Sequence, residues 1–268
     1  MMLIKTKMGY AFNRAYFDID KIMNSGQLAL IYKLDNVKYL CISEQNYCII
    51  YMNKTNTYIN TDNLEYWLNY FDFGFDYKGV CNSVDISDNF LYKATKYSQG
   101  IRILNRNLWE VMVAFILSQN NNIPNIMNMI RKLCKSYGNR IYKSYYSFPT
   151  FYQLRNCKLS DLQKLGFGYR AEYVYNLIQI ANSNINLEKQ FGTYERLLKL
   201  KGIGPKVANC IDLYGNHNYE SFPIDIHIQD ILDREYDGGS NFDWDLKYKG
   251  IYQMYMFYYE LNNKKRGK

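Results

Sequence analysis

The chain has 268 residues, of which 48% are hydrophobic and 22% charged, so it has enough apolar sequence for a buried core and is not an intrinsically disordered protein. It has 33 lysines and arginines against 25 aspartates and glutamates, a net charge of +8 that favours an anionic partner without identifying one. Its six cysteines form no C-x-x-C pair, which excludes the usual zinc and iron–sulfur spacings, so we expect no cofactor and free thiols in an intracellular, cytoplasmic protein.

The first third of the chain has the pattern of β-strands. Its opening residues, 1–20, contain no long apolar run, so we expect neither a signal peptide nor a membrane span there. Residues 28–34, 37–43 and 47–52 are short runs rich in β-branched and aromatic side chains, separated by polar breaks. We therefore predict an antiparallel sheet within an N-terminal domain of residues 1–96.

The hydrophobic period changes near Tyr97, after which helical spacing predominates. Ser160 and Gln163 have the spacing of a capping box, which predicts a helix that begins at Ser160. The other predicted helices cover residues 108–119, 124–137, 173–181 and 252–261. Together these elements predict an α+β protein in which a mainly α-helical domain, residues 97–268, follows the N-terminal antiparallel sheet.

The segment Gly202-Ile203-Gly204-Pro205 has the features of a tight turn between two helices. Glycine tolerates the backbone angles and close contacts of such a turn, and proline suits the first position of the second helix. Ile203 is expected to fill the core between the helices. The exposed amides and positive dipole of the second helix suit a phosphate, which predicts a helix-hairpin-helix that grips a DNA backbone. The alternative is an ordinary helical hairpin with a glycine turn.

Lys206 falls in the first turn of that second helix, and Cys210 falls one turn later on the same face. The helix dipole disfavours an additional positive charge there and favours nucleophilic use of the amine. Asp225, in the segment Pro-Ile-Asp, is expected to bring a carboxylate to the same cleft. An amine beside a carboxylate is what imine chemistry at a sugar C1′ requires. The alternatives are a solvated surface lysine and a helix N-cap at Asp225.

Several segments resemble the helix-hairpin-helix plus Gly/Pro-Asp superfamily of DNA glycosylases, and more narrowly the 8-oxoguanine DNA glycosylases of the eukaryotic type and their bacterial relatives. The matching segments begin with SQNNNIPNIMNMIRKLCKSYG and LGFGYRAEYV, continue with KGIGPKVANC and FPIDIHI, and end with YKGIYQMYMF. They occur in order between Tyr97 and Leu261, and five separate agreements in order are far less frequent by chance than one. The N-terminal region matches mainly through Ser25-Gly26-Gln27.

The resemblance implies a bifunctional DNA glycosylase/AP lyase that excises 8-oxoguanine from duplex DNA. Lys206 would be the Schiff-base nucleophile and Asp225 the catalytic carboxylate. In the base pocket, the Gly26 carbonyl would accept the N7 proton that distinguishes 8-oxoguanine from guanine. The remaining pocket residues would be Cys210 and Phe257, which would sandwich the flipped base, and Gln253, which would bond its Watson–Crick edge. Without the resemblance, Phe257 and Gln253 would be assigned to a helix core and surface.

The resemblance also assigns residues to the DNA surface. Tyr169 would wedge into the gap left by the flipped base, and Asn120 and Arg170 would bond the orphaned partner base. His227 would contact a phosphate, as would the hairpin at Gly202 and Gly204. The backbone carbonyls of the hairpin would hold a structural cation; these carbonyls belong to Leu198, Leu200 and Ile203. The alternatives are composition bias for Asn120, since asparagine is frequent throughout the chain, and a surface charge at a helix start for Arg170.

Two positions depart from the family pattern. Asn125 stands where eukaryotic members have an arginine that helps to require cytosine opposite the lesion, so we expect a relaxed preference for the opposite base. Ala29 stands where they have a phenylalanine. The predicted partner is double-stranded DNA containing 8-oxoguanine, with no membrane association and a monomeric protein. The rival functions are excision of another oxidised base by the same fold and a non-catalytic helix-hairpin-helix DNA-binding module.

Overall fold

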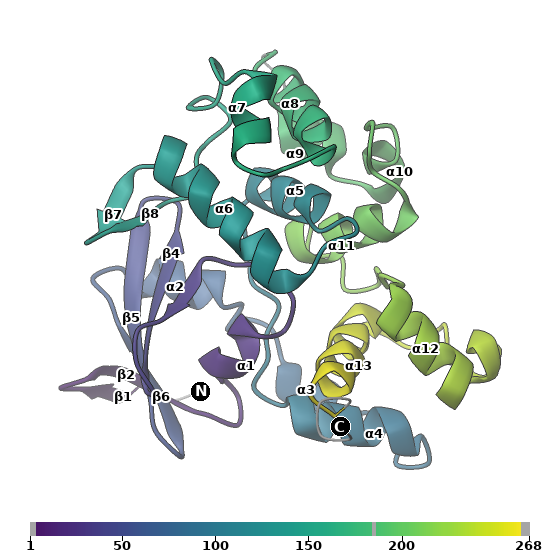
Figure 1. Cartoon of the computed structure of the whole chain (residues 1–268). Helices are drawn as coiled ribbons and strands as arrows, with labels where there is room; N and C mark the ends of the chain where they lie inside the picture. Colours follow the sequence, from purple (N-terminus) through teal and green to yellow (C-terminus); the bar gives the residue numbers. More distant parts are fainter. Residues whose placement is uncertain (1–3, 184–185, 264–268) are drawn as a thin grey trace.

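The structure is a computed structural model that describes residues 4–183 and 186–263. Its N-terminal region contains a six-stranded antiparallel sheet with the strand order β1-β2-β6-β5-β4-β3 (Figure 1). The strands are β1 (Ile4–Thr6), β2 (Gly9–Asn13), β3 (Ile31–Lys33), β4 (Lys38–Ser43), β5 (Asn46–Met52) and β6 (Asn56–Asn60). The predicted α+β class and the N-terminal antiparallel sheet are therefore confirmed.

The three predicted strands correspond to β3, β4 and β5. The first is shorter than expected because Leu28 has a left-handed backbone, with φ at 60°, and the ladder begins only at Ile31. Cys41 pairs with Cys48 across β4 and β5, and both side chains are fully buried. Strands β1, β2 and β6 were not predicted, because they carry few of the β-branched runs that indicated the other three.

Four helices precede or interrupt the predicted helical part, and none was expected. They are α1 (Ile19–Met23), α2 (Leu64–Tyr70), α3 (Tyr77–Asn82) and α4 (Asn89–Ser98). Each begins after an aspartate or asparagine whose side chain accepts an amide of the first turn, which satisfies donors that a helix start otherwise leaves free. The predicted domain boundary between residues 96 and 97 falls inside α4 and stays a prediction.

The predicted helices after Tyr97 are present, with others between them. The sequence of elements is α5 (Leu108–Leu117), α6 (Ile123–Tyr137), β7 (Arg140–Tyr142), β8 (Tyr145–Tyr146), α7 (Leu159–Lys164), α8 (Arg170–Ala181), α9 (Leu187–Phe191), α10 (Tyr194–Leu197), α11 (Pro205–Gly215), α12 (Ile226–Glu235), a 3₁₀ turn (Asp237–Gly239) and α13 (Lys249–Asn263). The predicted start of α7 at Ser160 is wrong. The helix begins at Leu159, and the Asp161 carboxylate accepts the backbone amide of Lys158 at 3.1 Å.

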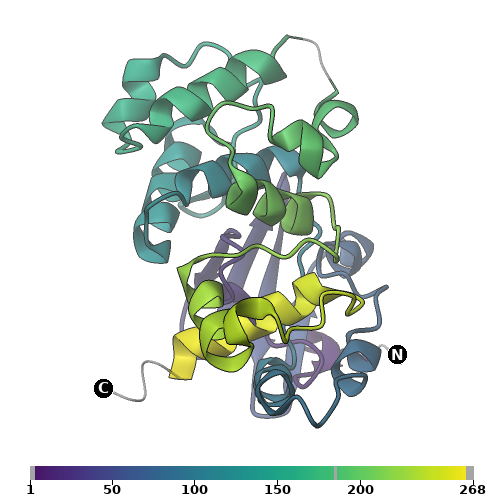
Figure 2. The same cartoon turned by 90° about the vertical axis from the view of Figure 1, so that its right-hand side faces the viewer.

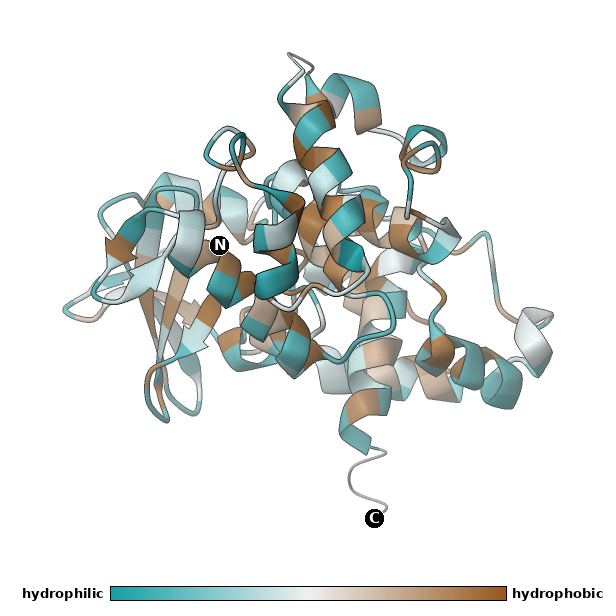
Figure 3. Cartoon of the chain, turned by 45° about the horizontal axis from the view of Figure 1, so that its top comes forward, coloured by the Kyte–Doolittle hydropathy of each residue, from teal (hydrophilic) through white to brown (hydrophobic). Residues whose placement is uncertain are grey.

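Helix α5 is the centre of the helical region, and every one of its residues is buried. It packs against α11 and α8, while α13 packs against α4 and α12 (Figures 1 and 2). The outer helices carry both hydrophobic and hydrophilic residues (Figure 3). This packing brings the start of α11, the start of α12 and one face of α13 toward the segment that joins α1 to β3. No helix in the described part of the chain is long and apolar enough to cross a membrane.

Candidate active site

The turn between α10 and α11 has the geometry of the predicted hairpin. Gly202 has a φ of +86°, and a Cβ there would lie 2.4 Å from Cγ of Tyr173, so both its angle and its surroundings require glycine. Ile203 is buried, as predicted. Gly204 caps α11 without a side chain and has no atom within 4 Å of a Cβ position, so the first turn of α11 is left open on that side. An open helix start of this kind suits an anion.

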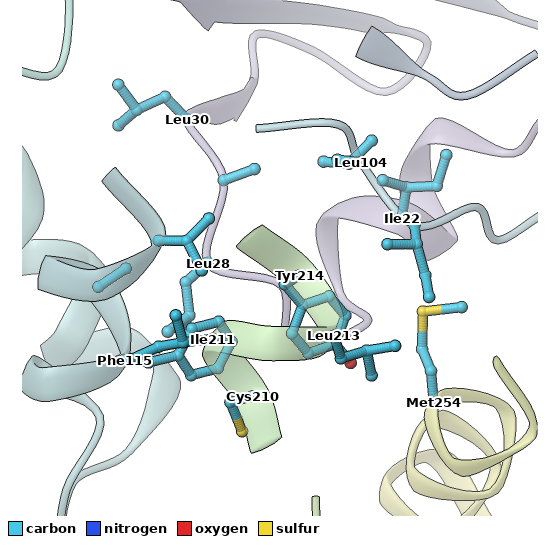
Figure 4. Close-up of a cluster of buried hydrophobic side chains, with 14 of the residues drawn as sticks. Ile22, Leu28, Leu30, Leu104, Phe115, Cys210, Ile211, Leu213, Tyr214 and Met254 are labelled. Carbon is cyan, nitrogen blue, oxygen red and sulfur yellow. The ribbon is translucent and has the colours of Figure 1, made fainter. Parts of the chain in front are cut away.

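Lys206 lies in the first turn of α11, one residue after Pro205. Its Nζ atom lies 6.0 Å from the ring centroid of Phe115 on α5. Cys210 follows one turn later on the same face and is buried in a cluster of hydrophobic side chains (Figure 4). Burial raises the pKa of the Cys210 thiol to about 11, and the positive charge of Lys206 works in the opposite direction. The thiol is therefore neutral at physiological pH.

Asp225 is the N-cap of α12, which was the structural alternative drawn from the sequence. Its Oδ1 atom accepts the backbone amides of His227 at 3.0 Å and Ile228 at 2.9 Å. The carboxylate also borders the same pocket as Lys206. Asp225 can be both a helix N-cap and a carboxylate of the pocket, because the cap bonds use one of its two oxygens and fix the carboxylate in place.

One pocket gathers all six residues that the sequence assigned to catalysis and to the base pocket. Its walls border about 370 Å³ of empty space, part of which is open solvent. The predicted residues on its wall are Gly26, Lys206, Cys210, Asp225, Gln253 and Phe257, and the additional ones are Ser25, Phe115, Tyr214 and Pro223. Phe115 and Tyr214 stack with their ring centroids 5.4 Å apart and form part of the apolar wall (Figure 4). Sequence reasoning missed both, since Phe115 lies in a uniformly apolar helix that gives no sign of one functional face.

Gly26 brings main chain, without a side chain, to the pocket. It has a φ of +85°, and a Cβ there would lie 2.8 Å from Cε1 of Phe257. The next residue, Gln27, is buried and holds this segment in place. Its amide donates to the Arg102 carbonyl at 2.8 Å, and its side-chain oxygen accepts the Leu104 amide at 2.9 Å. The backbone next to Gly26 is therefore held by long-range contacts of Gln27.

The side chain of Gln253, on the pocket wall, has one hydrogen-bond acceptor without a donor. The residue is 5% exposed, and its Nε2 atom donates to the Pro223 carbonyl at 2.9 Å. Its Oε1 atom is buried and has no partner among the described residues. A buried acceptor without a donor costs free energy, and an N–H group that entered the pocket could bond it.

A second, wider groove adjoins the pocket. It encloses about 1250 Å³ of open space and is bordered by Lys206, Asp225, Phe257 and His227. The His227 ring packs edge-to-face on Phe257 with a centroid separation of 5.8 Å. Its Nδ1 atom is buried and has no partner among the described residues. The groove therefore leads from the molecular surface to the lysine and the carboxylate.

The residues assigned to the partner base lie together at the ends of α5 and α8. Tyr169 is 50% exposed, and its hydroxyl lies 3.4 Å from Nδ2 of Asn120. Arg170 is not an exposed charge at a helix start, which was the alternative interpretation of the sequence. Its side chain is buried, lies over the Tyr169 ring, and donates to the carbonyls of Gln119 and Asn120. Asn125 donates through Nδ2 to Asn121 Oδ1 at 2.8 Å.

The proposed cation ligands lie at the hairpin, where the Leu200 carbonyl also accepts the Ile203 amide at 3.1 Å. Leu198 is 39% exposed, whereas Leu200 and Ile203 have buried side chains. Their role as cation ligands stays a prediction. In the part of the chain that the structure describes, no cluster of three or more His, Cys, Asp or Glu side chains could hold a metal.

Comparison with known proteins finds two family regions in the chain. Residues 10–112 match the N-terminal domain of 8-oxoguanine DNA glycosylase, and residues 113–240 match the HhH-GPD superfamily of base excision DNA repair proteins. An N-glycosylase/DNA lyase of Saccharomyces cerevisiae is 36% identical over 164 residues, which cover 53% of this chain and 44% of the yeast protein. The match to the N-glycosylase/DNA lyase of Arabidopsis thaliana covers 41% of that protein, so the chain spans less than half of these curated relatives.

Two solved structures are similar over nearly the whole chain. MBOgg1 in complex with a low affinity DNA ligand has a TM-score of 0.87 at 29% identity, with 100% of this chain and 99% of that chain covered. The 8-oxoguanine glycosylase/lyase of Clostridium acetobutylicum, in complex with double-stranded DNA containing cytosine opposite 8-oxoG, has a TM-score of 0.85 at 26% identity, with 98% and 99% covered. The chain therefore contains two family domains, an 8-oxoguanine DNA glycosylase N-terminal domain at residues 10–112 and an HhH-GPD domain of base excision DNA repair proteins at residues 113–240.

Proposed function

We propose that this protein is a bifunctional DNA glycosylase/AP lyase that excises 8-oxoguanine from duplex DNA. The observation that carries the proposal is the convergence of Lys206, Asp225 and the unpartnered Oε1 of Gln253 on one pocket. The lysine and the carboxylate supply the chemistry, and the glutamine supplies a buried acceptor for a base edge. The substrate places the protein inside the cell, in contact with DNA.

Lys206 acts as the nucleophile once it holds a neutral amine. Its Nζ atom attacks the sugar C1′ and forms the C1′–Nζ bond. The glycosidic bond breaks with its electron pair leaving on the base, which takes up a proton. The nitrogen then loses a proton, and the C1′–O4′ bond breaks with its electron pair on O4′, which takes up a proton, so that C1′ and Nζ form the Schiff base. Loss of a C2′ proton forms the C2′–C3′ double bond and breaks the C3′–O bond, and the 3′ phosphate leaves with that electron pair. Asp225 stabilises the positive charge that develops on the sugar, and its cap bonds to His227 and Ile228 keep it oriented without side-chain motion.

The pocket accounts for recognition of the oxidised base. 8-Oxoguanine carries a proton on N7, where guanine has only a lone pair, so the fixed Gly26 carbonyl accepts a bond from the lesion and repels guanine. Oε1 of Gln253 accepts an N–H of the Watson–Crick edge. Cys210 and Phe257 hold the two faces of the base, and the raised pKa of Cys210 keeps a neutral, polarizable thiol against the ring.

A base reaches this pocket only after it leaves the duplex, which costs a few kcal/mol. Tyr169, an exposed aromatic side chain, fills the gap. Asn120 contacts the orphaned partner base. Arg170 donates to the main-chain carbonyl of Asn120, and its guanidinium group has one N–H left to bond the base. Because Asn125 is a short neutral amide already bonded to Asn121, it adds little discrimination, so the preference for cytosine is relaxed.

The DNA backbone is held by the hairpin. Phosphates approach the open side of Gly204 and the uncapped first turn of α11, next to Gly202. His227 contacts a further phosphate at the mouth of the groove. A cation on the hairpin carbonyls of Leu198, Leu200 and Ile203 would orient the same turn.

The test is release of free base from duplexes that carry a single 8-oxoguanine, compared with guanine and with an oxidised pyrimidine. We expect release from the first alone. Gln253→Leu removes the acceptor and should slow excision by about one to two powers of ten, the value of one good base contact. Gln229→Leu is the control, because the Gln229 side chain is exposed and donates to Asp233 on its own helix. Release of the pyrimidine instead would show a different substrate, and binding without any release would show a non-catalytic DNA-binding module.

A further inference from the structure

Gln119 lies immediately after α5, between the core helix and the DNA surface. Its side-chain Nε2 atom donates to the Gly202 carbonyl in the hairpin at 3.0 Å and to the Ile116 carbonyl of its own helix at 3.1 Å. Both amide protons are therefore used. Through this one group, the end of α5 is tied to the turn that is proposed to grip the DNA backbone.

The main chain of the same residue is tied to the turn at the start of α8. The Gln119 carbonyl accepts Nε of Arg170 at 2.7 Å and the hydroxyl of Tyr169 at 3.4 Å. Arg170 also donates to the Asn120 carbonyl at 2.9 Å. Asn120 itself has a left-handed backbone, with φ at 44°, which asparagine tolerates better than most residues and which these bonds help to maintain.

Gln119 thus contacts the hairpin with its side chain and the wedge turn with its carbonyl, and it precedes the residue proposed to read the partner base. We propose that Gln119 is a positioning residue that couples the hairpin grip on the backbone to the contacts with the opened base pair. This inference rests on the proposed function, which supplies the roles of the hairpin, Tyr169 and Asn120. No step of that function requires the side chain of Gln119.

The coupling has a physical consequence for affinity. An intact duplex engages the hairpin alone, whereas an opened duplex engages the hairpin and the Tyr169–Asn120 surface together. Two binding elements held at a fixed separation bind a ligand that spans both more tightly than two loosely connected ones do, because the second contact needs no further ordering. Loss of the Gln119 amide bond should therefore weaken binding of opened DNA more than binding of intact DNA.

The experiment compares two labelled duplexes of the same sequence. One is intact, and the other carries a tetrahydrofuran abasic analogue opposite cytosine, which the lysine chemistry cannot process. Gln119→Met keeps the length of the side chain and removes both donors. We expect affinity for the abasic duplex to fall about fivefold, as for loss of one or two hydrogen bonds, and affinity for the intact duplex to change less than about twofold.

Asn182→Leu is the matched control. Nδ2 of Asn182, the residue after α8, also donates to one carbonyl of the neighbouring helix, Ile178 at 2.9 Å, and to one distant carbonyl, Phe151 at 2.9 Å; within the described residues it makes no hydrogen bond to the hairpin or the wedge turn. Both variants should lower the melting temperature to a similar extent. Only the Gln119 variant should change the ratio of the two affinities, which a purely structural role would leave unchanged.

The possible results separate the two proposals. The positioning role would be overturned if Gln119→Met left the ratio of the affinities for the two duplexes unchanged, or if Asn182→Leu changed that ratio equally. Either result would leave the proposed function intact. A wild-type protein that binds both duplexes equally would overturn the inference together with the proposed grip on opened DNA. A selective loss in Gln119→Met supports the coupling.

Discussion

Replacement of each hairpin glycine by alanine separates the fold of the hairpin from its grip on DNA. Gly202 has a φ of +86°, and an added Cβ would lie 2.4 Å from Cγ, 2.5 Å from Cδ2 and 2.7 Å from Cδ1 of Tyr173. Gly204 has a φ of −94° and an open Cβ position. The two substitutions add the same methyl group two residues apart, in opposite environments.

The cost of Gly202→Ala has two parts. A left-handed backbone costs a non-glycine residue about 1–2 kcal/mol, and forcing a methyl group into a packed aromatic side chain costs about 1–3 kcal/mol. The free energy of unfolding should therefore fall by about 2–5 kcal/mol. For a chain of this length that lowers the melting temperature by about 4–9 °C. Gly204→Ala has neither cost and should change the free energy of unfolding by less than about 0.5 kcal/mol.

The affinity of each variant for a fluorescent duplex is then measured well below the melting temperatures of both variants. The Cβ of Gly204→Ala projects from the uncapped start of α11, where a phosphate is proposed to approach the amides. Loss of one charge-assisted contact is worth about 1.5–3 kcal/mol, so affinity should fall by at least tenfold in a fully stable protein. The catalytic pocket is unaltered, since Gly204 is not on its wall.

Two results would refute this reasoning. A Gly202→Ala protein as stable as the wild type would show that the hairpin relaxes easily, so that neither its angle nor the Tyr173 contact constrains it. A Gly204→Ala protein that binds DNA normally would show that the open side of the turn faces no phosphate, and the helix-hairpin-helix would then be a structural hairpin only.

Three further predictions concern DNA and the pocket thiol. Because the grip is on phosphates, log affinity should fall with log salt at a slope of about −0.9 per neutralised phosphate, and a salt-independent affinity would contradict it. Single-turnover excision should tolerate adenine, guanine or thymine opposite 8-oxoguanine, and Asn125→Arg should add about 1–3 kcal/mol of preference for cytosine. A wild-type protein that excises 8-oxoguanine only opposite cytosine would refute this. Burial raises the pKa of Cys210 to about 11, so the rate of its alkylation, monitored by peptide mass mapping, should still increase as pH rises past about 9. Lys206→Gln should raise the pKa of Cys210 further, because it removes the opposing positive charge. A plateau of the alkylation rate near neutral pH would contradict it.

The fold class and the N-terminal sheet followed from the sequence, and the six residues assigned to the pocket lie on one wall, although their roles stay predictions. Lys206 and Asp225 follow signals that are local in the chain, a glycine turn and a helix start, and so they were found. The short helices α1 to α4 were missed because their stability comes from single Asp or Asn caps and from tertiary packing, and they are too short for a clear period.

The burial of Arg170 could not be predicted, for a different reason. A charged residue at a helix start is usually solvated, and nothing in the neighbouring sequence indicates that the carbonyls of Gln119 and Asn120, fifty residues earlier, meet its guanidinium. The orphaned Oε1 of Gln253 could not be predicted either, since an unfilled acceptor is a property of the packed structure. The hairpin, by contrast, follows from residues that are adjacent in sequence.

The central claim is that the amine of Lys206 forms a covalent bond with the sugar of a damaged nucleotide, and borohydride trapping tests it directly. Incubation with a duplex that carries 8-oxoguanine, in the presence of borohydride, should reduce the Schiff base to a stable protein–DNA adduct that peptide mapping places on Lys206. Lys206→Gln should lose the adduct and retain DNA binding, whereas the exposed Lys201→Gln, five residues earlier, should keep it. An adduct that persists in Lys206→Gln would contradict the assignment.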